Sequence, residues 1–172
     1  MQFATERLIL KAATPELSCA DLEDRKRFAQ LLEAAVPDDW PPEIFDDAAR
    51  HFFTKQLELQ PGDAGWWHWY LVVTDPVPTL VGTGGFGGGP DANGTIVTGY
   101  SLLPAHQGRG YGTEAVAALV TWAFREPAVR CIAAETYSHL LPSIRLLEKL
   151  AFRPAGAGET PGTLRFERLR TE

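Results

Sequence analysis

Three glycines lie within five residues in the segment QGRGYG (107–112), between a strand-like stretch and a helix-like one. Residues 95–103 are apolar and β-branched, as in a strand, and Pro104 then ends the strand because proline has no N–H to donate. Residues 113–125 carry apolar side chains at helical spacing, which predicts a helix packed on a sheet. The chain must therefore form a strand, a glycine loop and a helix in direct succession.

The glycine loop has the properties of an anion site. A helix N-terminus offers unpaired N–H groups and the positive end of the helix dipole, and glycine lets those groups approach an oxygen closely. Arg109 adds a positive charge to the loop. The GxGxG spacing differs from the dinucleotide pattern GxGxxG, and no lysine follows as in a P-loop. We expect a phosphate-bearing ligand, whose identity the loop alone leaves open.

Periodicity and turn residues predict the other elements. We expect strands at 7–12, 66–74, 80–88, 95–103, 129–137 and around 163–169, and helices at 21–36, 43–59, 113–125 and 142–150. The region 66–103 is typical of an antiparallel meander, and the strand–helix–strand order that follows predicts a parallel pair. The expectation is one α+β domain, residues 1–172, with a mixed sheet.

Composition narrows the function classes. The chain has 172 residues, 45% of them hydrophobic, and a formal net charge of −6, which argues against nucleic-acid binding because that needs a basic face. Its two cysteines, Cys19 and Cys131, are far apart and indicate a reducing compartment. No apolar run reaches membrane-span length, and the N-terminus does not resemble a signal peptide. A cytoplasmic protein without a membrane or nucleic-acid partner is expected.

Several segments together resemble a known family. Gln107-x-x-Gly110-x-Gly112 matches the pyrophosphate loop of the GNAT superfamily of N-acetyltransferases. TERLIL (5–10), the segment 99–124 and SIRLLEKLAFRPAG (143–156) resemble the branch that includes the ribosomal-protein alanine N-acetyltransferases, in the same order. The chain is therefore identified as a member of that superfamily.

The resemblance implies a fold and a co-substrate. It implies a mixed, mostly antiparallel twisted sheet of about six to seven strands, flanked by about four helices and splayed between the strands at 95–102 and 129–135. It also implies acetyl-CoA, without a metal ion. The implied acetyl-CoA contacts are Leu102, Leu103, Gln107, Gly108, Arg109, Gly110, Tyr111, Gly112, Thr113 and Ser143.

The implied reaction is direct attack of a primary amine on the thioester. The acceptor would be a protein N-terminus or a small-molecule amine, and the enzyme a monomer or homodimer. Two departures from the family pattern, Val97 in place of a glutamate and Leu140 in place of an asparagine, favour a second interpretation. In that interpretation the chain is a non-catalytic sensor or scaffold that binds acyl-CoA.

Candidate proton carriers follow from position. Ser143 falls where the family places a hydrogen bond to the CoA sulfur, and Glu135 and Tyr137 lie at the end of the fifth strand of the family fold. His139 lies in the same loop as Tyr137. For each of these residues a purely structural role, as a helix start, a strand end or a solvated loop, remains the alternative.

Candidate acceptor residues are aromatic. Trp40, flanked by two aspartates, and His68 lie in segments that border the acceptor cleft of the family, and Tyr100 lies next to the expected thioester. For His68 the alternative is a core position. The glycine run 82–89 is interpreted as hairpin bulges and not as a second phosphate loop.

Overall fold

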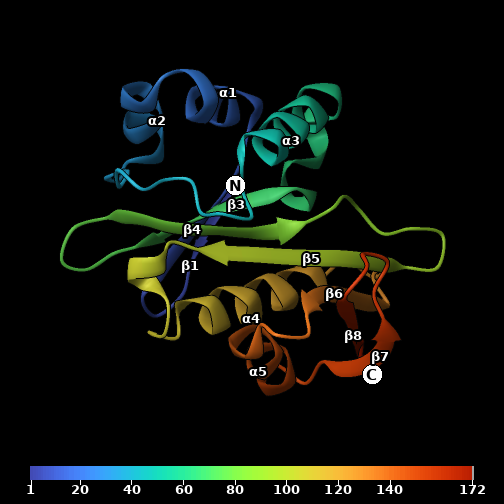
Figure 1. Ribbon diagram of the computed structural model, residues 1–172. Helices are drawn as coiled ribbons and strands as arrows, with labels where there is room; N and C mark the ends of the chain where they lie inside the picture. Colours follow the sequence, from blue (N-terminus) through green and yellow to red (C-terminus); the bar gives the residue numbers. More distant parts are fainter. Residues whose placement is uncertain (172) are drawn as a thin grey trace.

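The computed structural model describes residues 1–171 and is built on one eight-stranded sheet. The strand order is β1-β2-β3-β4-β5-β6-β8-β7 (Figure 1). The strands are β1 (Gln2–Ala4), β2 (Leu8–Ala12), β3 (His68–Val73), β4 (Thr79–Phe86), β5 (Thr95–Leu102), β6 (Cys131–Tyr137), β7 (Arg153–Ala157) and β8 (Thr163–Leu169). Only β5 and β6 pair in parallel, so the predicted mixed, mostly antiparallel sheet is confirmed.

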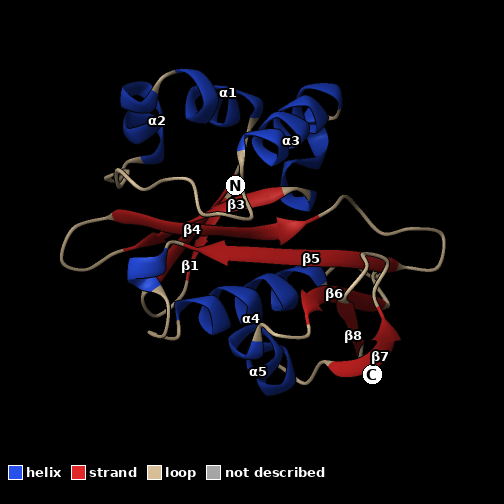
Figure 2. Cartoon of the chain, in the orientation of Figure 1, coloured by secondary structure: helices blue, strands red, loops and turns tan. Residues whose placement is uncertain are grey.

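Helices cover both faces of the sheet (Figure 2). They are α1 (Pro15–Glu23), α2 (Arg25–Leu32), α3 (Asp47–Leu59), α4 (Tyr111–Ala123) and α5 (Leu141–Lys149), with the short 3-10 helices η1 (Pro61–Trp66) and η2 (Pro104–His106). One face carries α1, α2 and α3, and the other carries α4 and α5. Each layer encloses its own apolar core. Within residues 1–171 no helix is long and apolar enough to cross a membrane.

β3 separates the two cores through its alternating side chains. Trp69 and Leu71 belong to the core beneath α4, while Tyr70 and Val72 belong to the core beneath α1–α3. Because successive residues of a strand point to opposite faces, a strand buried on both faces is apolar throughout. This explains the continuous aromatic and β-branched run, in which every residue of β3 is buried.

The predicted helix 21–36 is wrong in its bounds, since two helices occupy the region. The carboxylate of Asp24 accepts a hydrogen bond from the Arg27 N–H at 2.9 Å and so caps α2, while α1 has already ended. Glu33 then leaves the helix with φ of 60°. The predicted helix 43–59 begins only at α3, because Asp46 caps its first turn. The two edge strands β1 and β7 were not predicted.

β5 and β6 pair along only part of their length. Their ladder runs from the Thr95–Cys131 pair to the Thr98–Ala134 pair and includes no later residue of either strand. Beyond it, β5 pairs only with β4, and β6 only with β8. We call this opening the β5–β6 split. It is the splay that the family resemblance implied, and it lies at the end of β5 that leads into the glycine loop.

Candidate active site

The glycine loop adopts a backbone that favours glycine. Gly108 has φ of 72° and Gly110 has φ of 84°, both in the left-handed region that other residues rarely enter. Gly110 is the N-cap of α4, and no side chain caps the helix there. The loop therefore presents only main-chain groups, and no capping side chain, at the start of α4.

These main-chain groups are unpaired within the described chain. No hydrogen bond inside residues 1–171 uses the backbone N–H groups of 108–113, and the first N–H to bond back is that of Glu114, to the Gly110 carbonyl at 3.0 Å. Six consecutive donors thus surround the N-terminus of a 13-residue helix. Such a set, with the positive end of the helix dipole, is suited to a phosphate group.

Thr5 and Arg7, in the segment just before β2, hold the start of α4 in place. The Glu114 carboxylate accepts hydrogen bonds from the Thr5 hydroxyl at 2.6 Å and from the Arg7 backbone and Nε at 2.8 and 2.7 Å. Arg7 also donates to the Arg109 carbonyl at 2.9 Å. Partial burial raises the pKa of Glu114, but the bonds from Thr5 and Arg7 and the Arg7 charge outweigh it, and the pKa lies below its ordinary value.

We call the contacts of Thr5 and Arg7 with Glu114 the clamp. The clamp explains why the segment TERLIL accompanies the glycine loop, although the two are about a hundred residues apart. The sequence connected TERLIL with the family only by resemblance and predicted no role for it at the site. It missed Thr5, Arg7 and Glu114 as residues that position the loop. The one local signal was an acidic residue in the first turn of a predicted helix, which is common at any helix N-terminus.

The edge of β5 presents alternate backbone groups to the split. The Leu103 N–H donates to Val81 on the β4 side at 2.9 Å, and the Val97 carbonyl accepts from Gly87 on the same side. Because the pattern alternates, the backbone groups of Tyr100 and Leu102 face the split. The Leu102 carbonyl accepts from the Gln107 side chain at 3.1 Å, so Gln107 ties the loop to the strand.

The prediction that the main chain of Leu103 binds the pantetheine arm needs correction. Its N–H is used by Val81, and its carbonyl accepts from the His106 N–H at 2.9 Å. The side chain is also fully buried in the core beneath α1–α3. The donors available at this end of β5 therefore come from the residues before Leu103.

Two hydroxyl groups meet where α5 begins. The Ser143 Oγ and the Tyr100 hydroxyl lie 2.8 Å apart and share a hydrogen bond between α5 and β5. Burial raises the pKa of the Tyr100 phenol, and the hydrogen bond with Ser143 acts in the opposite direction. Ser143 is half-buried, so its side chain is neither in the core nor in free solvent. The structure thus joins two of the sequence-predicted site residues.

The proposed role of Glu135 as a base needs correction, because its carboxylate is already engaged. It accepts hydrogen bonds from the Glu159 N–H at 2.9 Å, the Thr163 hydroxyl at 3.1 Å and the Thr160 N–H at 3.4 Å. These bonds, that of Glu159 foremost, hold the pKa of Glu135 below its ordinary value. Glu135 therefore fastens the turn between β7 and β8.

Tyr137 is the last residue of β6, and His139 lies in the loop between β6 and α5. The Tyr137 side chain is exposed, and its ring stacks on that of His139 with the centroids 5.5 Å apart. Neither side chain hydrogen bonds to another described residue. Both remain candidates for proton transfer at the open end of the split.

A pocket of about 250 Å³ opens on the α3 face of β4 and β5. The loop before α3 and α3 itself form one wall, and β4 and β5 form the floor. It is lined by Ile44, Phe45, Ala49, Phe53, His68, Thr83, Gly84, Gly85, Phe86, Gly87, Val97, Thr98, Gly99, Tyr100 and Ser101. We call it the α3 pocket. The glycine run that was interpreted as hairpin bulges supplies part of its floor.

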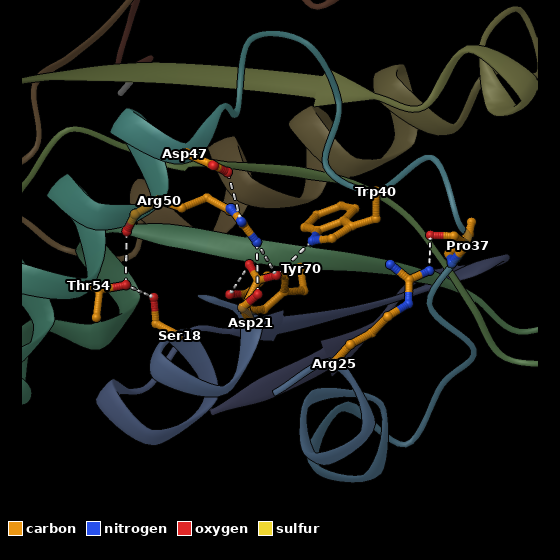
Figure 3. Close-up of polar contacts among 9 residues, drawn as sticks. All are labelled: Ser18, Asp21, Arg25, Pro37, Trp40, Asp47, Arg50, Thr54 and Tyr70. Carbon is orange, nitrogen blue, oxygen red and sulfur yellow. Dashed lines mark hydrogen bonds and ion pairs between the residues drawn. The ribbon is translucent and has the colours of Figure 1, made fainter. Parts of the chain in front are cut away.

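Trp40 is not a substrate contact but a buried anchor. It is 8% exposed and packs against the rings of Phe28, Phe45 and Tyr70. Its indole Nε1 donates to Asp21 Oδ1 at 2.7 Å (Figure 3). The prediction that Trp40 contacts the acceptor is wrong, because the ring faces the core and its N–H is used.

The bond from Trp40 belongs to a buried network that joins α1, α3 and β3 (Figure 3). Asp21 is buried and also accepts from the Tyr70 hydroxyl at 3.0 Å and from Arg50 Nη1 at 3.0 Å. Arg50 lies on α3, next to the pocket residue Ala49. The network therefore fixes the loop and helix that form one wall of the α3 pocket.

Comparison with known proteins agrees with this geometry. The family model of the GNAT acetyltransferase domain matches residues 7–153. The chain belongs to the GNAT acetyltransferase family. It is similar to an uncharacterized N-acetyltransferase of Bacillus subtilis, YjdG, with 33% identity over 149 residues, 86% of this chain and 87% of that protein. An uncharacterized Bacillus licheniformis N-acetyltransferase, p20, is 31% identical over 87 residues, 51% of this chain and 49% of its own length.

Solved structures share the GNAT fold. A ribosomal-protein-S5-alanine acetyltransferase from Vibrio fischeri has a TM-score of 0.69 at 17% identity, covering 98% of this chain and 96% of its own. A ribosomal L7/L12 alpha-N-protein acetyltransferase in complex with coenzyme A has a TM-score of 0.68 at 18% identity, covering 98% of both chains. At these identities the likeness concerns the fold alone. The eight-stranded sheet and its β5–β6 split agree with that fold.

Proposed function

We propose that this GNAT protein transfers an acetyl group from acetyl-CoA to a primary amine. The observation that carries the proposal is the run of six unpaired N–H groups at the start of α4, placed beside the β5–β6 split. A helix N-terminus binds phosphate, and an open strand edge binds an extended chain with amide groups. Acetyl-CoA offers both features in one molecule and supplies the acetyl group as a thioester.

The residues present fit this co-substrate. The main chain of 108–113, with Arg109, would hold the pyrophosphate, and the Arg7–Glu114 pair would keep that loop rigid. The backbone groups of Tyr100 and the N–H of Leu102 would bind the pantetheine amides in the split, while the Leu102 carbonyl is held by Gln107. The relative crystallised with coenzyme A has the same fold, which supports the assignment of this end of the sheet.

The chemistry asks little of the protein beyond positioning. In acetyl transfer a C–N bond forms, the C–S bond breaks, the amine loses a proton and the sulfur gains one. A backbone N–H of β5 facing the split would stabilise the charge on the thioester oxygen, an effect of about 3 kcal/mol for a well-placed donor. The Ser143 hydroxyl, oriented by Tyr100 at 2.8 Å, would donate a hydrogen bond to the departing thiolate, which takes its proton from water.

No carboxylate lines the α3 pocket to accept the proton of the amine. Val97, at the position where a glutamate is usual in the branch, forms part of the pocket surface instead. We propose that the amine loses its proton to water before it attacks the thioester. Tyr137 and His139 are the candidate side chains for assisting this proton transfer. The rate would then rise with pH until the amine itself is largely neutral.

The same absence of a carboxylate from the pocket supports the second candidate function, a sensor that binds acyl-CoA without turning it over. The two candidates differ in thiol release. The experiment is incubation of the protein with acetyl-CoA and a panel of amines and peptides, with free thiol measured over time and CoA affinity measured by calorimetry. Amine-dependent thiol release supports the enzyme, CoA binding without release supports the sensor, and no CoA binding contradicts both.

A pair of variants tests the loop itself. Gly110→Glu places a carboxylate among the phosphate donors and should lower CoA affinity at least a hundredfold. Gly156→Glu is the control, because Gly156 also has positive φ but lies on β7. A Cβ added at Gly156 meets nothing within 4 Å, and one added at Gly110 meets only the end of the Arg7 side chain at 3.2 Å. Equal CoA affinity of the two variants would show that the loop is not the phosphate site.

A further inference from the structure

The α3 pocket has a chemistry that restricts the acceptor. None of its lining residues is acidic, and none is lysine or arginine. A charged group that enters an apolar pocket without a partner loses its hydration at a high cost in free energy. A polyamine, with its second ammonium group, and a free amino acid, with its carboxylate, would each bring an unpaired charge into this pocket.

The pocket has room for a ring. Its volume of about 250 Å³ exceeds that of an engineered apolar cavity of ~150 Å³ that binds benzene. Glycine on the floor creates part of this space. Tyr100 reaches Ser143 on the α5 side of the sheet, so Gly99 beside it faces the α3 side. A Cβ added at Gly99 would meet nothing within 4 Å, so the space above it belongs to the pocket.

The pocket wall contains one buried polar side chain without a partner. His68 is 3% exposed, and neither ring nitrogen hydrogen bonds to any residue in the described part of the chain. The rings of Phe45, Phe53 and Tyr70 surround it at centroid distances of 5.0 to 5.1 Å. Burial lowers the pKa of His68 to about 3, so the imidazole is neutral and has one donor and one acceptor.

An unpaired buried imidazole destabilises the protein unless a ligand or an ordered water completes its hydrogen bonds. The aromatic residues around His68 can contribute ring contacts but no hydrogen bond to it, apart from the Tyr70 hydroxyl, which already donates to Asp21. The missing partner must therefore be supplied from the pocket. His68 is the one buried, unpaired polar side chain of the pocket lining among residues 1–171.

We propose that the acceptor is a primary amine on an uncharged, ring-sized apolar group that carries one neutral hydrogen-bonding atom for His68. The apolar group fills the space between Phe45, Phe53 and the glycine floor of β4 and β5. This proposal rests on the proposed acetyl transfer and adds the class of substrate. The same chemistry occurs in a free arylalkylamine and at the N-terminus of a peptide whose first residue is aromatic.

The test compares amines that differ in one property. Tyramine and phenethylamine differ by a hydroxyl on the ring, while spermidine adds charge and free phenylalanine adds a carboxylate. We expect kcat/KM for tyramine to exceed that for phenethylamine at least fivefold, and that for spermidine or free phenylalanine at least tenfold. Two peptide amides, one with phenylalanine and one with lysine as the first residue, test whether the acceptor is a peptide N-terminus or a free amine.

Two variants connect the preference to the pocket. His68→Phe keeps the ring packing but removes both nitrogens, so tyramine should lose its advantage over phenethylamine. Gly99→Val fills the floor and should raise KM for both ring amines at least tenfold without changing CoA affinity. Gly62→Val is the matched control, because Gly62 also has open space around it but lies in η1, outside the pocket lining.

A binding measurement separates failure of this proposal from failure of acetyl transfer. With CoA present, tyramine should raise the Tm of the wild-type protein but not of Gly99→Val. If CoA does not bind, the proposed function fails. If CoA binds but spermidine is the better substrate, or tyramine neither reacts nor raises the Tm, the substrate class is wrong while the acetyl-CoA site stands.

Discussion

Replacing Asp21 by alanine should lower the free energy of unfolding by about 3–5 kcal/mol, because it removes the centre of the buried network beneath α1 and α3. The carboxylate of Asp21 has a side-chain exposure of only 2% and accepts three side-chain hydrogen bonds. Without it, the Trp40 N–H and the Tyr70 hydroxyl are left buried and unpaired. Each unpaired group costs about 1–3 kcal/mol.

The charge of Arg50 moderates the loss. Its side chain is 12% exposed and still reaches Asp47 at 2.8 Å and the Asp21 backbone carbonyl at 2.8 Å after the substitution. The guanidinium is therefore not left wholly uncompensated. For this reason the expected loss stays within the range for breaking one buried ion pair, about 3–5 kcal/mol, although two further donors lose their acceptor.

Urea unfolding at pH 7.5, followed by circular dichroism, measures this loss, and Tm should fall by about 10 °C in a domain of this size. Asp38→Ala is the control, since Asp38 is exposed and pairs with Arg25 at 3.2 Å, and should change stability by less than about 0.5 kcal/mol. Asp21→Ala should also raise KM for the amine more than it weakens CoA binding. A stability within 1 kcal/mol of wild type would refute the role given to the network.

Three further substitutions test the site. Ser143→Ala should lower kcat at least tenfold with CoA affinity within twofold, and an unchanged kcat would show that its hydroxyl does not stabilise the departing thiolate. Because its folded-state pKa is lowered, Glu114 stabilises the protein above pH ~4.5 and loses this effect as the pH falls through that lowered pKa. Glu114→Gln should therefore be less stable at pH 7 and approach wild type at pH 3.5 in urea unfolding, whereas a gap independent of pH would contradict the clamp. Glu135→Gln should lower Tm but keep kcat within twofold, and a tenfold loss of kcat would restore its candidacy as a base.

Local patterns in the sequence predicted the parts of the fold that depend on neighbouring residues. The strand, glycine loop and helix from residue 95 to 125 were correct because alternation, proline and helical spacing act within a few residues. The boundary between α1 and α2 at Asp24 was missed, because an aspartate can lie on the exposed face of a continuous helix or cap the start of a new one. Only the orientation of its carboxylate toward the Arg27 N–H decides between the two.

Roles that depend on distant partners were harder to predict. Glu135 and Trp40 were plausible functional residues until their hydrogen-bond partners, Thr163 and Asp21, were known. His68 shows the converse, because its position in the chain was compatible with a core residue as well as a pocket residue. What distinguishes it is the absence of a partner for its ring within residues 1–171, and no pattern in the sequence reports that.

The short ladder between β5 and β6 divides the eight-stranded sheet into two unequal parts that share few hydrogen bonds. One contains β1 to β5 and the other β6, β8 and β7, and their direct contact in the sheet ends at the pair Thr98–Ala134. A pantetheine arm lying in the split would provide the next hydrogen bonds between β5 and β6. Acetyl-CoA would then link the two parts of the sheet while it is bound. Its binding and release in each catalytic cycle would close and reopen the β5–β6 split.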